Sequence, residues 1–421
     1  MNIYVAGISG TGMGPLALMA KQAGFTVFGS DLAEGAVAPE LFREGVEMKI
    51  GPEAQDGKFL RKCFEEKGVN WFVHTSAMRE DAPELLEAKR LGIRISKRDE
   101  LIAYLVEILG LKMVAVAGTH GKTTTTAMIT WVALKLELPI SYLVGSTLPF
   151  AEAGAYSPDS EFLIYEADEY DRNFLKFYPW AAVITTISYD HPDIYPTEAD
   201  YKAAFLKFIS QSERVIEIPE EKSPEYTEAI QKLNLAGEKR RYDAELALNA
   251  ILAMCEEVEK EVSVSEVVEI LNQFPGVGRR FERIAPQVYS DYGHHPEEIE
   301  ATIELANEEA KRLGLKGVVV TYEPHQNTRQ HEVLNSYRKV FEGAEHIFWL
   351  PTYLTREDKS LKILQPVEFI ARLSNSLAAE PAEVGKDLYE KLRKYLDNGY
   401  LLLFMSAGPL DAWVRDEKKW K

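Results

Sequence analysis

The chain has 421 residues, and its 66 acidic residues outnumber its 48 basic ones, which gives a formal net charge of −18. A chain of this length is longer than one hydrophobic core usually organises, which predicts two or three domains. The negative charge argues against nucleic acid as a partner. No apolar run reaches the ~20 residues that cross a bilayer, and no basic, apolar leader precedes the first strand, so we expect a cytoplasmic protein without a membrane partner. The two cysteines, Cys63 and Cys255, lack metal-site spacing.

The first predicted domain, residues 1–110, opens on a glycine-rich turn between a strand and a helix. Its first elements are a strand over 2–6, the turn GISGTGMG over 7–14, a helix over 15–23 and a strand over 25–28. This βαβ pattern, with Asp31 after the second strand, is typical of a Rossmann-like nucleotide-binding sheet. The strict motif G-x-G-x-x-G is absent because Ser9 replaces its second glycine. An NAD-dependent dehydrogenase and a turn without a ligand are therefore both open alternatives.

Further elements complete this domain. They are strands over 71–74 and 93–96 and helices over 81–91 and 99–109. In an open parallel sheet, ligands bind at the carboxyl ends of the strands. We therefore expect the glycine turn, the loop after the second strand and the loop at Thr75-Ser76-Ala77 to share one site.

The second predicted domain, residues 111–272, opens on a phosphate-binding loop. A β-branched apolar run over 112–117 predicts a buried parallel strand, and a helix is expected over 124–136. Glycines between them let the backbone approach an anion, which the start of a helix also attracts. We expect Lys122 to reach the β- and γ-phosphates and Thr123 to bind Mg²⁺. The usual pattern G-x-x-x-x-G-K-[ST] is broken at Val116, so a plain surface turn is the alternative.

The stretch GTHGKTTTT, residues 118–126, resembles the ATP loop of the Mur ligases, the ATP-dependent amide-bond ligases of peptidoglycan synthesis. Other motifs similar to those of this family occur in the family's order along nearly the whole chain. The resemblance implies an α/β fold with three domains. These are a Rossmann-like N-terminal domain, a central domain like a P-loop ATPase and a Rossmann-like C-terminal domain over 273–421.

In this family the first domain holds a UDP-sugar rather than NAD, with the glycine turn on the diphosphate. The turn at 7–14, the Gly29-Ser30-Asp31 element and the loop after residue 74 all match family motifs. The residues that the resemblance implies in UDP-sugar binding are Gly7, Ser9, Gly10, Thr11, Gly12, Met13, Ser30, Asp31 and Ser76.

Acidic residues follow two predicted strands of the central domain. The strand over 162–165 leads into EADEYD, and the strand over 181–187 leads into SYDHPD. Carboxylates and a histidine at strand ends, facing a phosphate loop, are suited to a divalent cation, although a solvated loop is the alternative for either segment. The match to the family's E-A-D-E and D-H-x-D-x-Y motifs implies that Thr123, Glu166 and His191 bind Mg²⁺ or Mn²⁺. It also implies that His120 lies near the carboxylate of the sugar nucleotide, in a catalytic set with Lys122, Glu166 and His191.

The remainder of the central domain departs from the family. It is expected to be shortened between residues 191 and 280, with a charged surface element over 217–237. The family's H-N-x-x-N-A segment near the adenine retains only Asn249 of its His-Asn…Asn set. The residues that the resemblance implies in ATP binding are Gly118, Thr119, Gly121, Lys122, Thr123, Thr124, Asn249, Arg280 and Asp291.

The third predicted domain follows the hinge FPGVGRRFE at 274–282. Its predicted elements are strands over 288–290, 317–321, 347–350 and 401–405 and a helix over 297–314. By the family match Arg280 contacts the ATP phosphates, although an exposed basic pair is the alternative, and Asp291 of DYGHHP binds the ATP ribose. The adjacent histidines have no third ligand at metal-site spacing. In PHQNTR, at 324–329, the match implies that His325 and Arg329 hold the incoming amino acid, with the arginine on its carboxylate.

The resemblance implies a ligase that joins L-alanine to UDP-N-acetylmuramate through an acyl phosphate, with ATP converted to ADP and phosphate. It implies ATP and Mg²⁺ (or Mn²⁺) as cofactors and a monomer or homodimer. Three alternatives stay open: a recycling ligase that adds a preformed tripeptide to the same sugar nucleotide, a ligase for glycine or serine, and a sugar-nucleotide sensor that has lost turnover.

Overall fold

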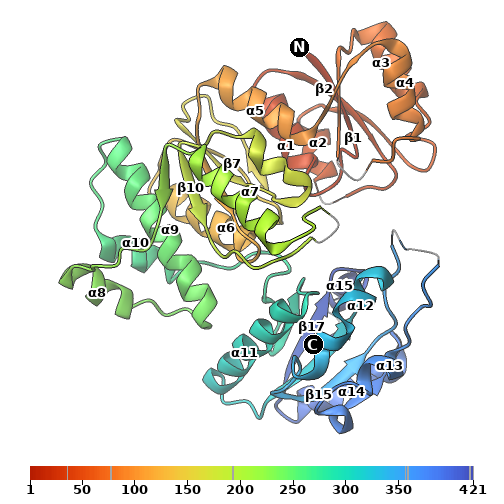
Figure 1. Cartoon of the computed structure of the whole chain (residues 1–421), viewed down its shortest axis with the longest axis vertical. Coiled ribbons are helices and arrows are strands. Elements are labelled where there is room, and N and C mark those ends of the chain that lie inside the picture. Colours follow the sequence, from red (N-terminus) through yellow and green to blue (C-terminus); the bar gives the residue numbers. More distant parts are fainter. Residues whose placement is uncertain are drawn as a thin grey trace. The chain divides into compact units, whose positions relative to one another are not determined.

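A computed structural model describes residues 1–35, 37–75, 78–191, 194–355, 357, 360–416 and 419–420. Within these residues the fold is α/β, with three sheets of five, six and six strands (Figure 1). The chain forms two compact units. One comprises residues 1–233 and 242–275 and holds the first two sheets, and the other comprises residues 234–241 and 276–421 and holds the third.

The first sheet is parallel throughout and has the strand order β3-β2-β1-β4-β5. Its strands are β1 (Asn2–Ala6), β2 (Thr26–Asp31), β3 (Glu47–Ile50), β4 (Trp71–His74) and β5 (Arg94–Lys97). Its helices are α1 (Gly14–Gln22), α2 (Ala38–Arg43), α3 (Lys58–Lys67), α4 (Pro83–Leu91) and α5 (Arg98–Leu109). Alternate residues of β1 enter two different hydrophobic clusters, because helices cover both faces of the sheet. The strand order reverses beside β1, so the glycine turn that follows β1 lies at the usual ligand position of such a sheet.

The second sheet has the order β11-β10-β6-β9-β7-β8 and is parallel except where β8 joins β7. Its strands are β6 (Lys112–Ala117), β7 (Ile140–Leu143), β8 (Gly154–Ala155), β9 (Phe162–Glu166), β10 (Ala181–Ile184) and β11 (Arg214–Ile216). The helices after β6 are α6 (Lys122–Lys135), the 3-10 helix η1 (Tyr170–Lys176), α7 (Glu198–Ser210), α8 (Pro224–Gln231), α9 (Glu238–Glu257) and α10 (Val264–Leu271). The central position of β6, between β10 and β9, brings the loops after all three strands to one edge.

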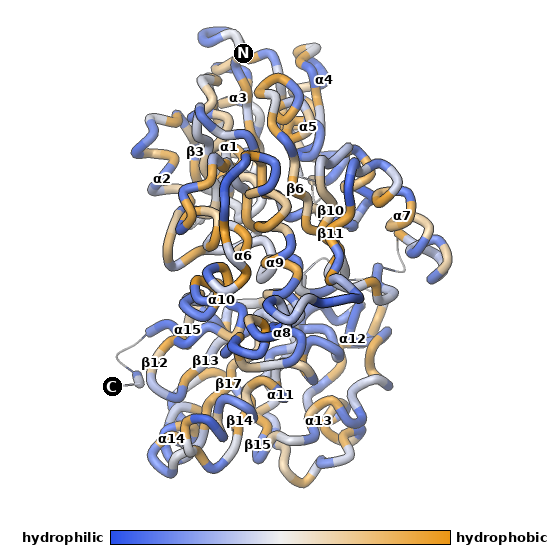
Figure 2. Tube along the Cα trace, turned by 90° about the vertical axis from the view of Figure 1, so that its left-hand side faces the viewer, coloured by the Kyte–Doolittle hydropathy of each residue, from blue (hydrophilic) through white to orange (hydrophobic). Residues whose placement is uncertain are grey.

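The third sheet has the order β12-β13-β17-β14-β15-β16, and only β12 runs antiparallel to its neighbour. Its strands are β12 (Glu282–Ala285), β13 (Val288–Asp291), β14 (Val318–Glu323), β15 (Ala344–Trp349), β16 (Ala379–Pro381) and β17 (Leu401–Ser406). Its helices are α11 (Pro296–Arg312), α12 (Asn327–Val333), α13 (Pro366–Ile370), α14 (Lys386–Asp397) and α15 (Leu410–Val414), with 3-10 turns η2 (Leu334–Arg338) and η3 (Ser376–Ala378). Hydrophobic residues line β14 and β17, whereas α14 is largely hydrophilic (Figure 2).

Several expected elements differ from the structure, among them three of the central domain. The strand expected over 181–187 ends at Ile184, because the chain leaves the sheet there to contact the phosphate loop. The helix expected from Thr124 begins at Lys122. The expected surface element over 217–237 contains a helix, α8, whose Tyr226 and Ala229 are buried. Among the described residues, no helix combines the length and apolar character that crossing a membrane takes.

Candidate active site

The phosphate loop connects β6 to α6 through two glycines in conformations that other residues rarely adopt. Gly118 has φ +145° and Gly121 has φ +85°. A Cβ on Gly118 would lie 2.1 Å from Thr185 Oγ1, and one on Gly121 would lie 2.6 Å from Asp243 Oδ1. Gly121 is the N-cap residue of α6, and no described side chain caps this helix. The loop thus presents the start of a helix to an anion, as a phosphate site requires.

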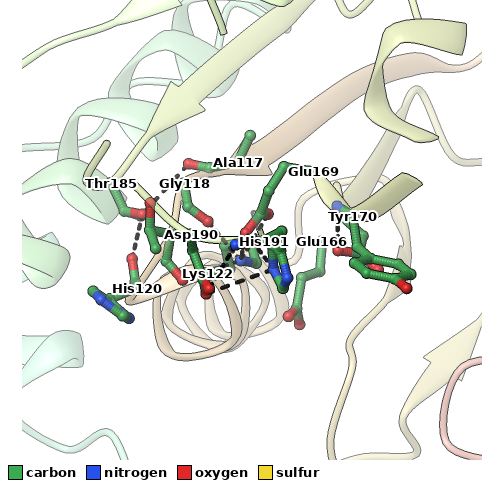
Figure 3. Close-up of polar contacts among 12 residues, drawn as sticks. Ala117, Gly118, His120, Lys122, Glu166, Glu169, Tyr170, Thr185, Asp190 and His191 are labelled. Atoms are coloured by element: carbon green, nitrogen blue, oxygen red, sulfur yellow. Dashed lines mark hydrogen bonds and ion pairs between the residues drawn. The ribbon is translucent and has the colours of Figure 1, made fainter. Parts of the chain in front are cut away.

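The segment after β10 holds this loop in place. Thr185 Oγ1 donates a hydrogen bond to the carbonyl of His120 at 2.5 Å, and Thr119 N donates to the carbonyl of Thr186 at 2.7 Å. Thr119 Oγ1 donates to the carbonyl of Ser188 at 2.7 Å. These bonds fix the loop backbone. The ring of His120 points away from Lys122 (Figure 3).

Lys122 is half-buried at the centre of the loop, and its ammonium donates three hydrogen bonds. Its Nζ donates to the carbonyl of Gly118 at 2.5 Å and lies 2.9 Å from Glu169 Oε2 (Figure 3). Burial lowers the pKa of Lys122, but Glu169 and Asp168 raise it more, so the net pKa lies above its usual value. Burial raises the pKa of Glu169, whose side chain is 1% exposed, but Lys122 and His191 bring the net pKa below its usual value. Both groups are therefore charged at neutral pH and form a buried ion pair.

Thr123 and Glu166 are in direct contact beside this pair. Thr123 Oγ1 donates to Glu166 Oε1 at 2.8 Å, and Gly145 N donates to Glu166 Oε2 at 3.0 Å. Glu166 ends β9, and Thr123 lies in the first turn of α6. A hydroxyl and a carboxylate in contact are hard oxygen donors and fit a Mg²⁺ or Mn²⁺ ion.

His191, the third expected metal ligand, lies at the same strand edge with a strained backbone of φ 58°. Its Nε2 is 3.6 Å from Asp190 Oδ2 and 3.7 Å from Glu169 Oε1. Burial lowers the pKa of His191, but Glu169 and Asp190 raise it more, so the net pKa is above its usual value. His191 therefore faces Glu169, the carboxylate that pairs with Lys122, and Glu166 lies close by (Figure 3).

The glycine turn of the first sheet is held by Ser30 and Asp31. The N–H groups of Gly7 and Ile8 donate to the carbonyl of Ser30 at 2.8 and 3.0 Å, and Ser9 N donates to Asp31 Oδ2 at 2.8 Å. Gly10 and Thr11 are exposed, Gly7 and Gly12 are half-buried, and Ser9 and Met13 are buried. Ser76 lies outside the described residues.

The side chain of Ser30 does not face this turn. It is 0% exposed, and its Oγ donates to Glu84 Oε1 at 2.6 Å, as does the hydroxyl of Tyr4. Its backbone carbonyl, rather than its hydroxyl, shapes the turn. Asp31 likewise uses a carboxylate oxygen to order the loop.

Asn249 lies on α9, and both amide hydrogens are engaged. Its Nδ2 donates to Tyr226 OH at 2.8 Å and to the carbonyl of Glu245 at 2.7 Å. Any contact from Asn249 to an adenine would therefore use the amide oxygen in this conformation.

In the second unit, Asp291 is buried at the end of β13. Its Oδ2 accepts from Phe281 N at 2.7 Å and its Oδ1 from Gly293 N at 2.6 Å. Burial raises the pKa of Asp291 to about 6. Arg280 lies over the ring of Tyr292, 5.3 Å from its centroid. Asp291 thus orders the hinge that carries Arg280.

His325 and Arg329 lie at the end of β14 and on α12. The ring of His325 stacks on Tyr353 with centroids 5.9 Å apart and meets the ring of His294 edge-on at 5.7 Å. Arg329 is half-buried and close enough to lower the pKa of His294. The structure therefore brings the two expected amino-acid-binding residues together around His294.

Two family models match the chain: the catalytic domain of the Mur ligase family over residues 2–108 and the Mur ligase middle domain over residues 116–268. A UDP-N-acetylmuramate–L-alanine ligase of Carboxydothermus hydrogenoformans is 31% identical over 455 residues, covering 98% of this chain and 95% of that protein. The chain belongs to the Mur ligase family. Since the alignment runs over 455 residues and this Mur ligase has 421, the relative carries residues that this chain lacks.

Solved structures agree with the fold of this Mur ligase. A UDP-N-acetylmuramate–alanine ligase of Thermotoga maritima matches with a TM-score of 0.75 at 22% identity, covering 100% of this chain and 99% of that one. A murein peptide ligase of Psychrobacter arcticus matches with a TM-score of 0.65 at 21% identity, covering 100% and 98%. The expected three-domain α/β fold is confirmed, whereas the boundaries at 110/111 and 272/273 stay predictions.

Sequence reasoning missed Glu169 as the partner of Lys122 in this Mur ligase. Glu169 stands in the acidic run after β9, three residues beyond Glu166, and a lysine largely withdrawn from water requires a carboxylate partner. That requirement was the available signal. Arg98, which contacts both Asp99 and Asp168, was also missed, because nothing local distinguishes it from other helix-start arginines.

The depressed pKa of His294 predicts a pH-dependent stability. Burial lowers the pKa of His294 to about 4. The unfolded chain then binds the proton more readily, so stability that is complete above about pH 6.5 is lost as the pH falls towards 4. Between pH 8 and pH 5 the His294 contribution to the free energy of unfolding should fall by about 2 kcal/mol.

Comparing wild type with His294→Gln by urea denaturation at both pH values isolates this contribution. The comparison is needed because the raised pKa of Asp291 acts in the opposite direction in the same unit, and Glu298 and Arg329 also face His294. Equal pH dependence in the two proteins would contradict the prediction.

Proposed function

We propose that this Mur ligase joins L-alanine to UDP-N-acetylmuramate, with ATP converted to ADP and phosphate, in the cytoplasm. The named relative supports this proposal over the whole chain. The observation that carries it is the loop in which Lys122, paired with Glu169, lies beside the Thr123–Glu166 contact. That arrangement suits an enzyme that transfers the γ-phosphoryl group of ATP.

The reaction needs activation because a carboxylate is a poor electrophile. An oxygen of the muramate carboxylate attacks the γ-phosphorus, ADP leaves, and an acyl phosphate forms. The alanine amine then attacks the acyl carbon, the C–O bond to phosphate breaks, and the amine loses a proton. No protein nucleophile takes part, so catalysis rests on positioning and electrostatics.

Each residue has a role in this scheme. Lys122 leaves Glu169 in part to bind the γ-phosphoryl, while the N–H groups at the start of α6 bind the β-phosphate. Thr123, Glu166 and His191 would hold Mg²⁺, which neutralises charge on the transferring group. Arg280 and Asp291 are proposed to bind ATP, and Arg329 to bind the alanine carboxylate with His325 beside it.

The metal assignment predicts a specific effect of losing the Thr123 hydroxyl. Thr123→Ala should raise the Mg²⁺ concentration for half-maximal activity by about 10–100-fold, because one oxygen donor and the orientation of Glu166 are lost together. Thr123→Ser retains the hydroxyl and should keep the wild-type requirement. An unchanged Mg²⁺ requirement in Thr123→Ala would remove Thr123 from the ligand set.

A panel of amines tests the substrate assignment. With ATP, Mg²⁺ and UDP-N-acetylmuramate present, kcat/KM is compared for L-alanine, glycine, L-serine and the tripeptide L-alanyl-γ-D-glutamyl-meso-diaminopimelate. We expect L-alanine to be preferred. Preference for the tripeptide would make the chain a recycling ligase, and no phosphate release with any amine would make it a sensor. Monomer or homodimer stays a prediction.

A further inference from the structure

The start of α5 contacts the acidic segment around the end of β9 through four consecutive residues. These contacts join the first sheet to the second within one compact unit. The pairs are Lys97 with Asp171, Arg98 with Asp168 at 3.9 Å, Asp99 with the hydroxyl of Tyr165 at 3.3 Å, and Glu100 with Lys176 at 2.9 Å.

Arg98 has a second neighbour, which is the glycine turn. A Cβ added to Gly12 would lie 2.7 Å from Arg98 Nη1, so the guanidinium lies directly against the turn. Its contacts with carboxylates are loose, at 3.4 Å to Asp99 Oδ1 and 3.9 Å to Asp168 Oδ2. Close charge-assisted hydrogen bonds measure about 2.7–2.9 Å. The Arg98 guanidinium therefore forms no close hydrogen bond with either of these two carboxylates.

The other end of this contact adjoins the phosphate loop. Asp168 lies two residues after Glu166 and directly before Glu169. Glu169 in turn is 2.9 Å from Lys122 Nζ. Arg98 therefore stands between the glycine turn, where the diphosphate of a sugar nucleotide would bind, and the acidic cluster of the ATP site.

We propose that Arg98 is shared by the two nucleotide sites and couples their occupancy. This inference rests on the proposed function. With no sugar nucleotide bound, the guanidinium faces Asp168 and offsets negative charge beside the cation-binding residues. A diphosphate at the glycine turn carries more negative charge than one carboxylate and accepts the Arg98 fork in two hydrogen bonds, so it draws the guanidinium from Asp168. The acidic cluster of Glu166, Asp168 and Glu169 then attracts a divalent cation more strongly.

Linkage fixes the sign and the symmetry of the effect. If the sugar nucleotide tightens cation binding by some factor, the cation tightens sugar-nucleotide binding by the same factor. Arg98 is a positioning residue in this scheme rather than a catalytic one.

The test measures Mn²⁺ affinity of the protein saturated with β,γ-methylene-ATP, with and without UDP-N-acetylglucosamine. This sugar nucleotide carries the diphosphate but no lactyl carboxylate, so it cannot reach the cation directly. In the wild type we expect Mn²⁺ to bind about fivefold or more tightly when the sugar nucleotide is present. In Arg98→Gln, Mn²⁺ should bind tightly even without UDP-N-acetylglucosamine. Adding this sugar nucleotide should change the Mn²⁺ affinity less than about twofold.

Lys97→Gln is the matched control, because Lys97 belongs to the same junction and pairs with Asp171. This variant should retain the wild-type ratio of Mn²⁺ affinities with and without UDP-N-acetylglucosamine. Asp168→Asn tests the same link from its other end and should also lower the factor below about twofold, while UDP-N-acetylglucosamine still binds.

A wild-type factor near one, or an undiminished factor in Arg98→Gln and Asp168→Asn, would overturn the proposal. Failure of the proposed function is distinguishable, because it would appear as absent alanine-dependent phosphate release in the wild type, a reaction that does not depend on this coupling.

Discussion

Lys122→Ala is expected to abolish ligase activity, with kcat lowered by about 10³-fold or more, because the charge that stabilises the transferring phosphoryl group is lost. The sequence alone predicts that the fold survives this change. The structure alters that expectation, because Glu169 is 1% exposed and would lose its cationic partner. Removing one member of a buried ion pair costs about 3–5 kcal/mol of stability.

The double variant Lys122→Ala, Glu169→Gln separates the two effects. It removes the stranded charge, so its melting temperature should recover most of the loss, while activity should stay absent. Thermal unfolding and phosphate release measured on the wild type and on the single and double variants provide the comparison. Full activity in Lys122→Ala would refute the phosphate-loop assignment, and unchanged stability would refute the buried pair.

Arg329→Ala should raise the KM for the amino acid by about 10–100-fold, because a charge-assisted pair with its carboxylate is lost. The KM for ATP should change less than about twofold, since Arg329 belongs to α12, four residues after His325, and not to the phosphate loop. Arg329→Lys should recover part of the loss, because lysine retains the charge but not the planar fork.

Arg338→Ala is the matched control for this prediction. Arg338 is exposed on η2, which directly follows α12, and both KM values should stay at wild type. Equal increases of both KM values in Arg329→Ala would count against its carboxylate role.

The central parallel strands and the glycine loops of this chain could be predicted from the sequence, because local runs of apolar residues and glycine positions determine them. Strands buried on both faces, such as β6 and β17, each contain an unbroken run of five apolar residues. Two edge strands, β3 and β11, could not be predicted from the sequence. β3 is built of exposed and half-buried residues, and only one residue of β11 is buried, so neither shows the apolar run of a central strand.

Side-chain partners at the site depended on tertiary structure. Glu169 faces Lys122 where the chain turns into η1, in which Asp171 and Arg172 take left-handed backbone conformations. The sequence of the acidic run does not indicate which of its carboxylates faces Lys122. The same applies to Ser30, whose position in the motif was recognised but whose hydroxyl binds Glu84 beneath the sheet.

Phosphate release with ATP, Mg²⁺ and UDP-N-acetylmuramate, with and without L-alanine, tests the central claim most directly. The account predicts release only when L-alanine is present, together with one UDP-N-acetylmuramoyl-L-alanine formed for each phosphate. Absence of phosphate release in the presence of L-alanine would contradict it.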